Sequence, residues 1–289
     1  MKTRIVATVG ILGGALASLA GGANAPRERV APIIERIRQA DYAGDRAALK
    51  RLRDDLAPWA ADATVGSRVR YWQGFALWRR AFNGFNDQAP AEDLAADLSA
   101  AVADFDAALA LDSKFVDAQI GAISCLSNLA FLHRQDAAAI QDFIRKVGPR
   151  VEAANHLDPD NPRLLWVTGA NRWYAPAERG GGQTAAIATY EKGLAEARRR
   201  GASADPLEPS WGEPELLMNL GWSNLNRSTP DLDAAGRAAE SALALVPSWH
   251  YVRDILLPQI RAARDKARGE ASAPDPSRKE KSSCGSARP

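Results

Sequence analysis

Apolar and small residues recur through the middle of the chain at successive spacings of four and three, which place them on one face of an α-helix. The pattern occurs four times: at Ala101, Phe105 and Ala108; at Val147, Val151 and Ala154; at Ala186, Tyr190 and Gly193; and at Ala235, Ala239 and Ala242. Alternating runs of Val, Ile and Thr, which would predict strands, are missing from the sequence. We therefore predict an all-α protein.

Each of these four helices is paired with a second apolar segment of helical composition, at residues 69–80, 116–132, 163–174 and 215–226. The breaks between segments carry the residues that start and stop helices. Asn161 and Pro162 supply an N-cap and a first-turn proline, and Pro159 closes the helix before them. The alternation predicts a series of helical hairpins.

Two of the paired segments carry partial repeat motifs, Leu217-x2-Leu220-Gly221 and Trp166-x2-Gly169-Ala170-x2-Trp173. Over residues 66–250 the chain resembles the tetratricopeptide repeat family, whose pattern begins W-x2-L-G-x2-Y. The resemblance implies a right-handed α-solenoid of about four to five TPR-like helical hairpins. Successive second helices are 46, 39 and 49 residues apart, whereas the family period is about 34. That longer spacing also overlaps α-solenoid repeats of the HEAT type.

In the tetratricopeptide family the first helices of the hairpins line a concave surface that binds peptides or proteins. On these helices aromatic residues and arginines are interleaved. The candidate binding residues are Arg68, Tyr71, Trp78, Arg79, Arg163, Trp166, Trp173 and Trp222. The resemblance thus implies an exported scaffold for protein–protein or peptide binding through its concave face. The alternative function is a noncatalytic small-ligand carrier that uses an aromatic groove.

The repeat register leaves two positions open for Trp166 and Trp173. Counted from Pro159, Gly169 takes the small-residue position of the family, and both tryptophans face the groove. The match to the motif instead places both in the core, where a tryptophan removes more apolar area from water. In that case Arg79 and Arg163 are the better groove residues, and their replacement should weaken partner capture without lowering the melting temperature.

The two ends of the chain differ from its middle. Residues 1–25 contain Lys2 and Arg4, an uncharged apolar run and an Ala23-Asn24-Ala25 exit, as in a secretory signal peptide. An uncleaved anchor is the other interpretation of this run. We predict an N-terminal helical hairpin, a degenerate repeat, at residues 26–65, a TPR-like solenoid with a terminal capping helix at 66–268, and a disordered tail at 269–289. The predicted location is periplasmic or secreted, with no stable membrane insertion of the mature chain.

Charge and chemistry exclude several function classes. Lys and Arg number 37 against 35 Asp and Glu, and this balance argues against nucleic-acid binding. The three histidines and two cysteines form no zinc module, disulfide framework or catalytic signature. We therefore expect no enzyme activity, no cofactor and no metal site. Cys125 lies in an apolar helix and is expected to be buried, while pairing through Cys284 in the tail stays open.

Overall fold

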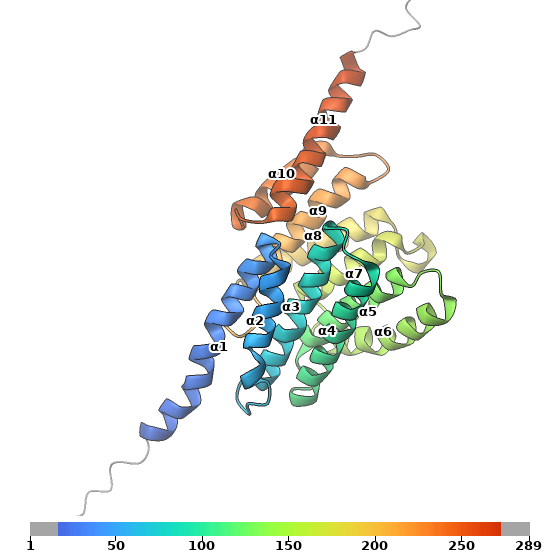
Figure 1. Ribbon diagram of the computed structural model, residues 1–289. Helices are drawn as coiled ribbons and strands as arrows, with labels where there is room; N and C mark the ends of the chain where they lie inside the picture. Colours follow the sequence, from blue (N-terminus) through green and yellow to red (C-terminus); the bar gives the residue numbers. More distant parts are fainter. Residues whose placement is uncertain (1–16, 273–289) are drawn as a thin grey trace, which may run out of the picture. The chain divides into compact units, whose positions relative to one another are not determined.

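The computed structural model describes residues 17–272, and these residues form α-helices joined by short turns, with no strand among them (Figure 1). The all-α class is therefore confirmed. The α-helices are α1 (Ala17–Ala43), α2 (Arg46–Asp55), α3 (Gly66–Asn86), α4 (Ala91–Leu111), α5 (Val116–Leu132), α6 (Ala137–Leu157), α7 (Pro162–Tyr174), α8 (Gln183–Arg200), α9 (Glu213–Asn226), α10 (Leu232–Leu245) and α11 (Leu257–Ser272). Two single 3-10 turns, at Ala57–Trp59 and Ala177–Arg179, and a π-helical turn at Tyr251–Leu256 complete the description.

Helix boundaries follow the capping residues of the sequence. The Asn161 side chain accepts a hydrogen bond from the backbone N–H of Arg163 at 2.9 Å, and Pro162 occupies the first turn of α7. Asp136 caps α6 in the same manner, accepting from the N–H groups of Ala138 and Ala139. Such caps satisfy N–H groups that have no partner inside the helix. The start predicted at Asn161 is confirmed.

The chain divides into two compact units, which are described separately. The first contains residues 17–41, 45–159 and 202–210, and the second contains residues 42–44, 160–201 and 211–272. In the first unit α2, α3, α4, α5 and α6 pack as consecutive neighbours (Figure 1). In the second unit α7 pairs with α8 and α9 pairs with α10. The helical-hairpin arrangement is thus present, and the right-handed superhelix stays a prediction.

The core of the first unit lies along α3 and α4. Ala101, Phe105 and Ala108, one of the four sets with the repeated spacing, are fully buried. A Cβ atom on Gly121 of α5 would lie 2.3 Å from the Phe105 ring. Only a residue without a side chain allows α5 to approach α4 this closely. Residues 26–65, predicted as an N-terminal hairpin, lie mostly in this unit, with 42–44 assigned to the other.

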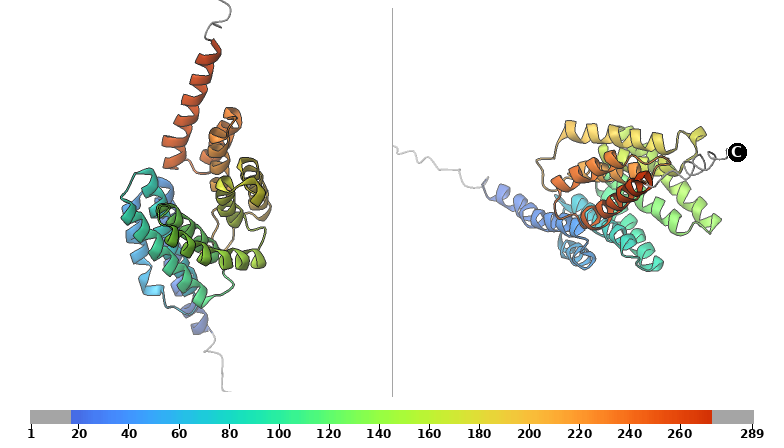
Figure 2. Two further views of the ribbon diagram at one scale, coloured as in Figure 1. Left: turned by 90° about the vertical axis from the view of Figure 1, so that its right-hand side faces the viewer. Right: turned by 90° about the horizontal axis from the view of Figure 1, so that it is seen from above.

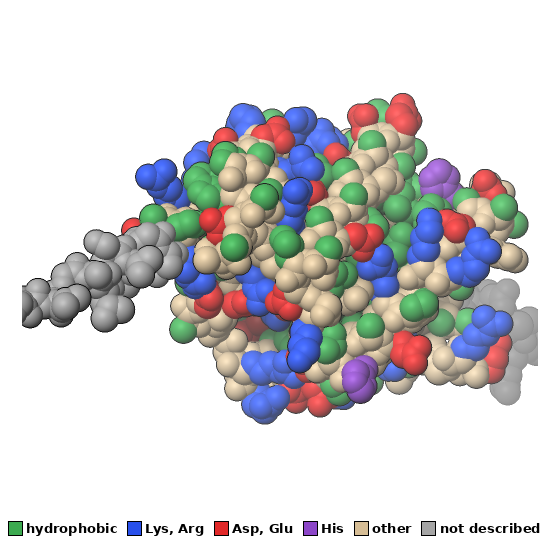
Figure 3. Space-filling view, turned by 90° about the horizontal axis from the view of Figure 1, so that it is seen from below, with side chains coloured by type: hydrophobic (Ala, Val, Ile, Leu, Met, Phe, Trp, Pro, Cys, Tyr) green, Lys and Arg blue, Asp and Glu red, His purple; other side chains and the backbone are tan. Residues whose placement is uncertain are grey.

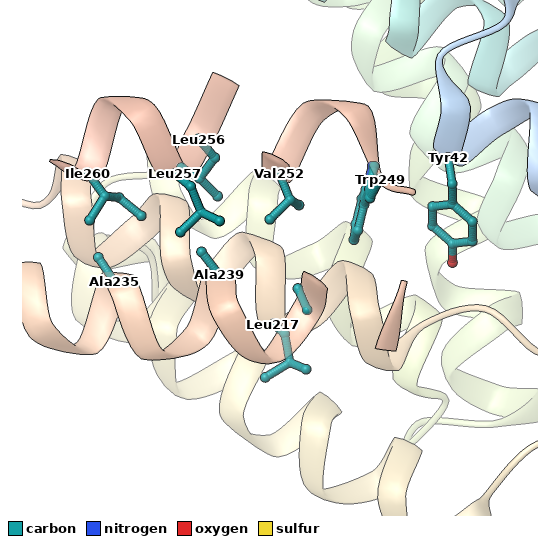
Figure 4. Close-up of a cluster of buried hydrophobic side chains, with 10 residues drawn as sticks. Tyr42, Leu217, Ala235, Ala239, Trp249, Val252, Leu256, Leu257 and Ile260 are labelled. Atoms are coloured by element: carbon teal, nitrogen blue, oxygen red, sulfur yellow. The ribbon is translucent and has the colours of Figure 1, made fainter. Parts of the chain in front are cut away.

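The core of the second unit is built on α10. Ala235, Ala239 and Ala242 are fully buried, and they pack against a cluster that includes Trp249, shown in Figure 4. The Tyr42 ring meets the Trp249 ring edge-on at a centroid distance of 5.1 Å. Small residues at these helix positions allow the neighbouring apolar side chains to come close.

Among residues 257–269, helix α11 is buried only at its N-terminal end. Leu257 and Ile260 belong to the cluster on α10, whereas the C-terminal part of the helix extends beyond α10 (Figure 2). The helix continues to Ser272 and so enters the segment that we predicted as a disordered tail from residue 269. The rest of that segment, including Cys284, lies outside the described residues.

The predicted leader, residues 1–25, lies largely outside the described part of the chain. Helix α1 begins at Ala17 and continues without a break through Ala25 to Ala43. Cys125 is fully buried, as predicted. Its thiol is free, and burial raises the pKa of that thiol well above its ordinary value.

Candidate functional site

The structure places the candidate residues of α3 in the core rather than in a groove. Tyr71 and Trp78 are fully buried. The Trp78 ring lies edge-on to Phe75 at 5.8 Å, and Tyr71 packs beside Phe115 at 5.0 Å. The prediction that Tyr71 and Trp78 line a binding surface is therefore wrong for this structure, because helices on both sides cover them.

Arg79 is also buried, which corrects its assignment as the better groove candidate. Its side chain is 6% exposed, and Nε donates to the Asp41 carboxylate at 2.8 Å. Asn83 donates to the same carboxylate at 3.2 Å. Desolvation raises the pKa of Asp41, and the Arg79 charge opposes this shift. Arg79 thus neutralises a buried carboxylate, so its removal should lower stability.

Arg68 and Arg163 lie at the edges of the cores of their units. Arg68 forms ion pairs with Asp112 and with Glu208, the latter at 2.7 Å, and its guanidinium lies 4.0 Å from the centre of the Phe115 ring. Arg163 donates to the backbone carbonyl of Trp211 at 3.1 Å. Both guanidinium groups hold local structure through these contacts.

Of the three remaining candidates, one is buried and two are partly exposed. Trp166 is 5% exposed and donates from Nε1 to the Glu215 carbonyl at 3.2 Å. Its burial agrees with the core register and corrects its assignment to the groove. Trp173 and Trp222 are partly exposed and meet edge-on at 5.1 Å. We call these two residues the Trp173–Trp222 pair; the neighbouring Tyr174 is 80% exposed.

A second exposed apolar area lies on the hairpin of α5 and α6, and the sequence reasoning missed it. We define the α5–α6 apolar surface as Phe131, His133, Phe143 and Ile144. Phe131 is 56% exposed and Ile144 is 62% exposed, while Phe143 is partly exposed. The His133 ring is exposed and lies 5.8 Å from the Phe143 ring centre.

The sequence shows the apolar positions of α6 but not their exposure. Ile140, Phe143, Ile144, Val147 and Val151 follow a helical spacing, yet none of them is fully buried. Only Ala154 of this 21-residue helix is buried. The repeated spacing at Val147 and Val151 predicted a helix face, but it could not predict how much of that face a neighbour covers.

Basic side chains flank the α5–α6 apolar surface. The Arg134 guanidinium lies 4.8 Å from the centre of the Phe131 ring. Lys146 and Arg145 form ion pairs with Asp142 at 2.6 and 3.0 Å, and hydrogen bonds from Lys146 and then Arg145 lower the pKa of that carboxyl group. On the face of the molecule drawn in Figure 3, basic and acidic side chains are interspersed.

The second unit has a cleft of about 720 Å³ between the α9–α10 turn and α11. Its lining includes Arg227, Arg264 and Arg268 together with Asp231 and Asp233. Arg264 already donates to the Leu232 carbonyl at 2.9 Å. A lining of charges of both signs suits a polar ligand and does not suit an apolar one.

The described residues contain neither a candidate membrane span nor a candidate metal site. No helix between residues 17 and 272 is long and apolar enough to cross a bilayer. The same residues contain no group of three or more His, Cys, Asp or Glu side chains arranged to hold a metal ion.

Comparison with known proteins gives one structural neighbour. No family model matches the chain, and no curated protein matches it either. A solved structure, the HusA haemophore from Porphyromonas gingivalis, is similar to it. The fold is similar to that of a haemophore. The TM-score is 0.52 at 19% sequence identity, over 68% of this chain and 94% of the haemophore.

This neighbour corrects the function that the repeat motifs implied. We predicted a scaffold for proteins or peptides, whereas the similar fold belongs to a haemophore. The buried positions of Tyr71, Trp78, Arg79 and Trp166 also remove much of the surface on which the scaffold would have acted. The resemblance to the tetratricopeptide family itself stays a prediction.

Proposed function

We propose that this protein is a noncatalytic carrier of a flat, largely apolar small molecule of the haem class. The observation that carries the proposal is the α5–α6 apolar surface, in which Phe131, Ile144 and His133 are exposed and Phe143 is partly exposed. The similarity of the fold to a haemophore supports this ligand class. The proposal includes export through the leader at residues 1–25.

The shape and polarity of haem suit this surface. A porphyrin is a rigid planar ring whose faces are apolar, and aromatic side chains pack well against such faces. Phe131 and Ile144 each expose more than half of their area to water. Covering apolar area stabilises a complex by about 25 cal/mol per Å². Exposed groups of this kind often mark ligand or partner sites.

The charges beside the surface suit the carboxylates at one edge of haem. Residues 131–147 contain three basic side chains, Arg134, Arg145 and Lys146, against the acidic Asp136 and Asp142. Arg134 lies against Phe131 and is exposed, so its guanidinium can turn toward a carboxylate at the margin of the bound ring. Arginine pairs with carboxylates in a two-pronged geometry.

The place of α6 in the fold explains why this surface is open. As part of the proposal, we take the consecutive hairpins of the first unit as repeats of an α-solenoid. Terminal repeats of a solenoid require a polar outer face to stay soluble without a partner. Helix α6 packs mainly on α5 and instead presents Phe143 and Ile144 to solvent. A bound ligand would cover these side chains.

Titration of the purified protein with hemin, followed by absorbance and by melting temperature, tests the proposal. We expect saturable binding of one hemin per chain and a higher melting temperature, because a ligand that binds the folded state stabilises it. The double variant Phe131→Ser/Ile144→Ser should bind at least tenfold more weakly.

Leu245→Ser is the matched control, because Leu245 is 50% exposed at the end of α10 and lies outside the surface. It should bind like the original chain. Nonsaturable uptake of hemin, or equal binding by the double variant and the control, would contradict the proposed function.

A further inference from the structure

We infer that His133 is the iron ligand of the bound haem, an inference that rests on the carrier function proposed above. The geometry that points to it is the place of the imidazole within the α5–α6 apolar surface. His133 caps the C-terminus of α5, where its backbone N–H donates to the Leu129 carbonyl at 3.0 Å. Its ring projects beside Phe143, at 5.8 Å between ring centres.

The position of the imidazole meets the requirements of an axial ligand. Haem iron is commonly held by a histidine nitrogen while apolar side chains cover the porphyrin. Here the imidazole is exposed and its ring lies beside that of Phe143, while Phe131 and Ile144 are exposed apolar residues of the same hairpin. On binding, a ring nitrogen would coordinate the ferric iron through its lone pair in place of a water ligand. The oxidation state of the iron would not change.

The other two histidines of the sequence are less suited to this role. His250 Nδ1 lies 2.8 Å from the Asp254 carboxylate, and the His250 ring packs against Gly44. His156 is exposed on α6, but it is twelve residues after Ile144. At 1.5 Å per residue that separation is about 18 Å along the helix. His156 is therefore a good control, since it lies on α6 with Phe143 and Ile144 but outside the α5–α6 apolar surface.

The side chains of other residue types offer weaker alternatives. Cys125 is fully buried, so its sulfur cannot reach a ligand at the surface. Tyr174 is 80% exposed and could offer a phenolate oxygen, as some haem proteins do. It lies in the second unit beside the Trp173–Trp222 pair. Tyr174→Phe therefore distinguishes ligation there from ligation by His133.

The test compares hemin with metal-free protoporphyrin IX, which has the same ring and carboxylates but no iron to ligate. Both molecules are titrated into the full chain and into His133→Ala, His156→Ala and Tyr174→Phe. The absorption spectrum and the electron paramagnetic resonance spectrum of ferric hemin report its axial ligand. We expect His133→Ala to bind hemin at least tenfold more weakly and to lose the spectrum of a nitrogen ligand.

The same variant should bind metal-free protoporphyrin IX within twofold of the original chain, because Phe131, Phe143 and Ile144 are unchanged and this molecule has no iron to ligate. His156→Ala and Tyr174→Phe should match the original chain for both molecules. An unchanged hemin spectrum in His133→Ala, or loss of the nitrogen ligand in either control, would overturn the inference and leave the carrier function standing. Failure of the original chain to bind either molecule would overturn both.

Discussion

Helices α3 and α6 belong to the same unit and both contain 21 residues, but their surroundings are opposite. Helix α3 has fourteen buried residues, among them Tyr71, Trp78 and Arg79. Helix α6 has one, Ala154. The first helix packs between α2 and α4, whereas the second packs mainly on α5. Coverage by neighbouring helices, and not residue type, separates a core residue from an exposed one.

The comparison changes which residues matter for function. Aromatic residues and arginines on α3 have found partners in one another and in Asp41 and Phe105. Apolar residues on α6 remain in contact with water. A ligand gains binding energy by covering exposed apolar area, and it gains none from area that the fold already covers. The Trp173–Trp222 pair offers a ligand less apolar area for the same reason, since each ring already covers part of the other.

The largest expected difference between the two helices is in stability. Trp78→Ala removes a fully buried ring and should lower the free energy of unfolding by about 3–5 kcal/mol. Phe131→Ala, near the start of the α5–α6 turn, should change it by less than about 0.5 kcal/mol because that ring is mostly exposed. Chemical denaturation measures both. Equal losses of unfolding free energy in the two variants would show that α3 and the α5–α6 hairpin do not differ in packing as described.

A buried ion pair gives the next prediction. Arg79→Ala leaves the Asp41 carboxylate buried without its cation, and breaking such pairs costs about 3–5 kcal/mol. We therefore expect a lower melting temperature, the reverse of what the groove assignment predicted. Arg145→Ala on α6 is the control, because the Arg145 side chain is 75% exposed. If Arg79→Ala melts at nearly the same temperature as the control, then the Arg79–Asp41 ion pair does not stabilise the fold.

The contact between α4 and α5 gives an intermediate effect. Gly121→Ala would place a methyl group 2.3 Å from the Phe105 ring, so the helices must separate. Overpacking of this kind costs about 1–3 kcal/mol. Gly148→Ala on α6 should cause no such loss, since no atom beyond the adjacent residues and the nearby backbone of α6 lies within 4 Å of the added carbon. Thermal denaturation of the two variants tests whether close packing ends before α6.

Much of the fold was predictable because its signals are local. The spacing at Ala101, Phe105 and Ala108 and the cap at Asn161 depend on residues that are near in sequence. The burial of Arg79 was not predictable, because its partner Asp41 lies 38 residues away in the sequence. The repeat register that decides whether Trp166 is buried was not predictable either. It depends on the contact of Gly169 with Tyr190 across a hairpin.

The candidate site was missed for a related reason. Phe143 and Ile144 have the spacing of a core face, and the sequence contains no mark that α6 packs mainly on α5. An exposed apolar position and a buried one look the same in such a pattern. His133 and Phe143 are ten residues apart in the sequence, and no local spacing indicates that their rings approach each other in the structure.

The smallest expected effect is a difference in acid sensitivity. A hydrogen bond from Arg68 lowers the pKa of Asp112 below its ordinary 3.8, so this pair stabilises the fold above that pH. The stabilisation is lost as the pH falls through the lowered pKa of the folded state. Arg68→Gln should reduce stability at pH 7 by less than about 1 kcal/mol, because the pair is partly exposed.

Unfolding curves between pH 2 and pH 7 measure this effect, and the variant should lose less stability on acidification than the original chain. A steeper loss in the variant would show that the Arg68 contact has been assigned the wrong sign. The Asp142 carboxyl on α6 is paired in the same manner, but it is exposed and provides no matching contact to a second helix.

Hydrogen–deuterium exchange of the full chain, with and without one equivalent of hemin, shows where the ligand binds. We expect slower exchange in peptides from residues 129–147, which contain the α5–α6 apolar surface, and no change in peptides from residues 219–227 around Trp222. Protection confined to the peptides around Trp173 and Trp222, with none in residues 129–147, would contradict this expectation.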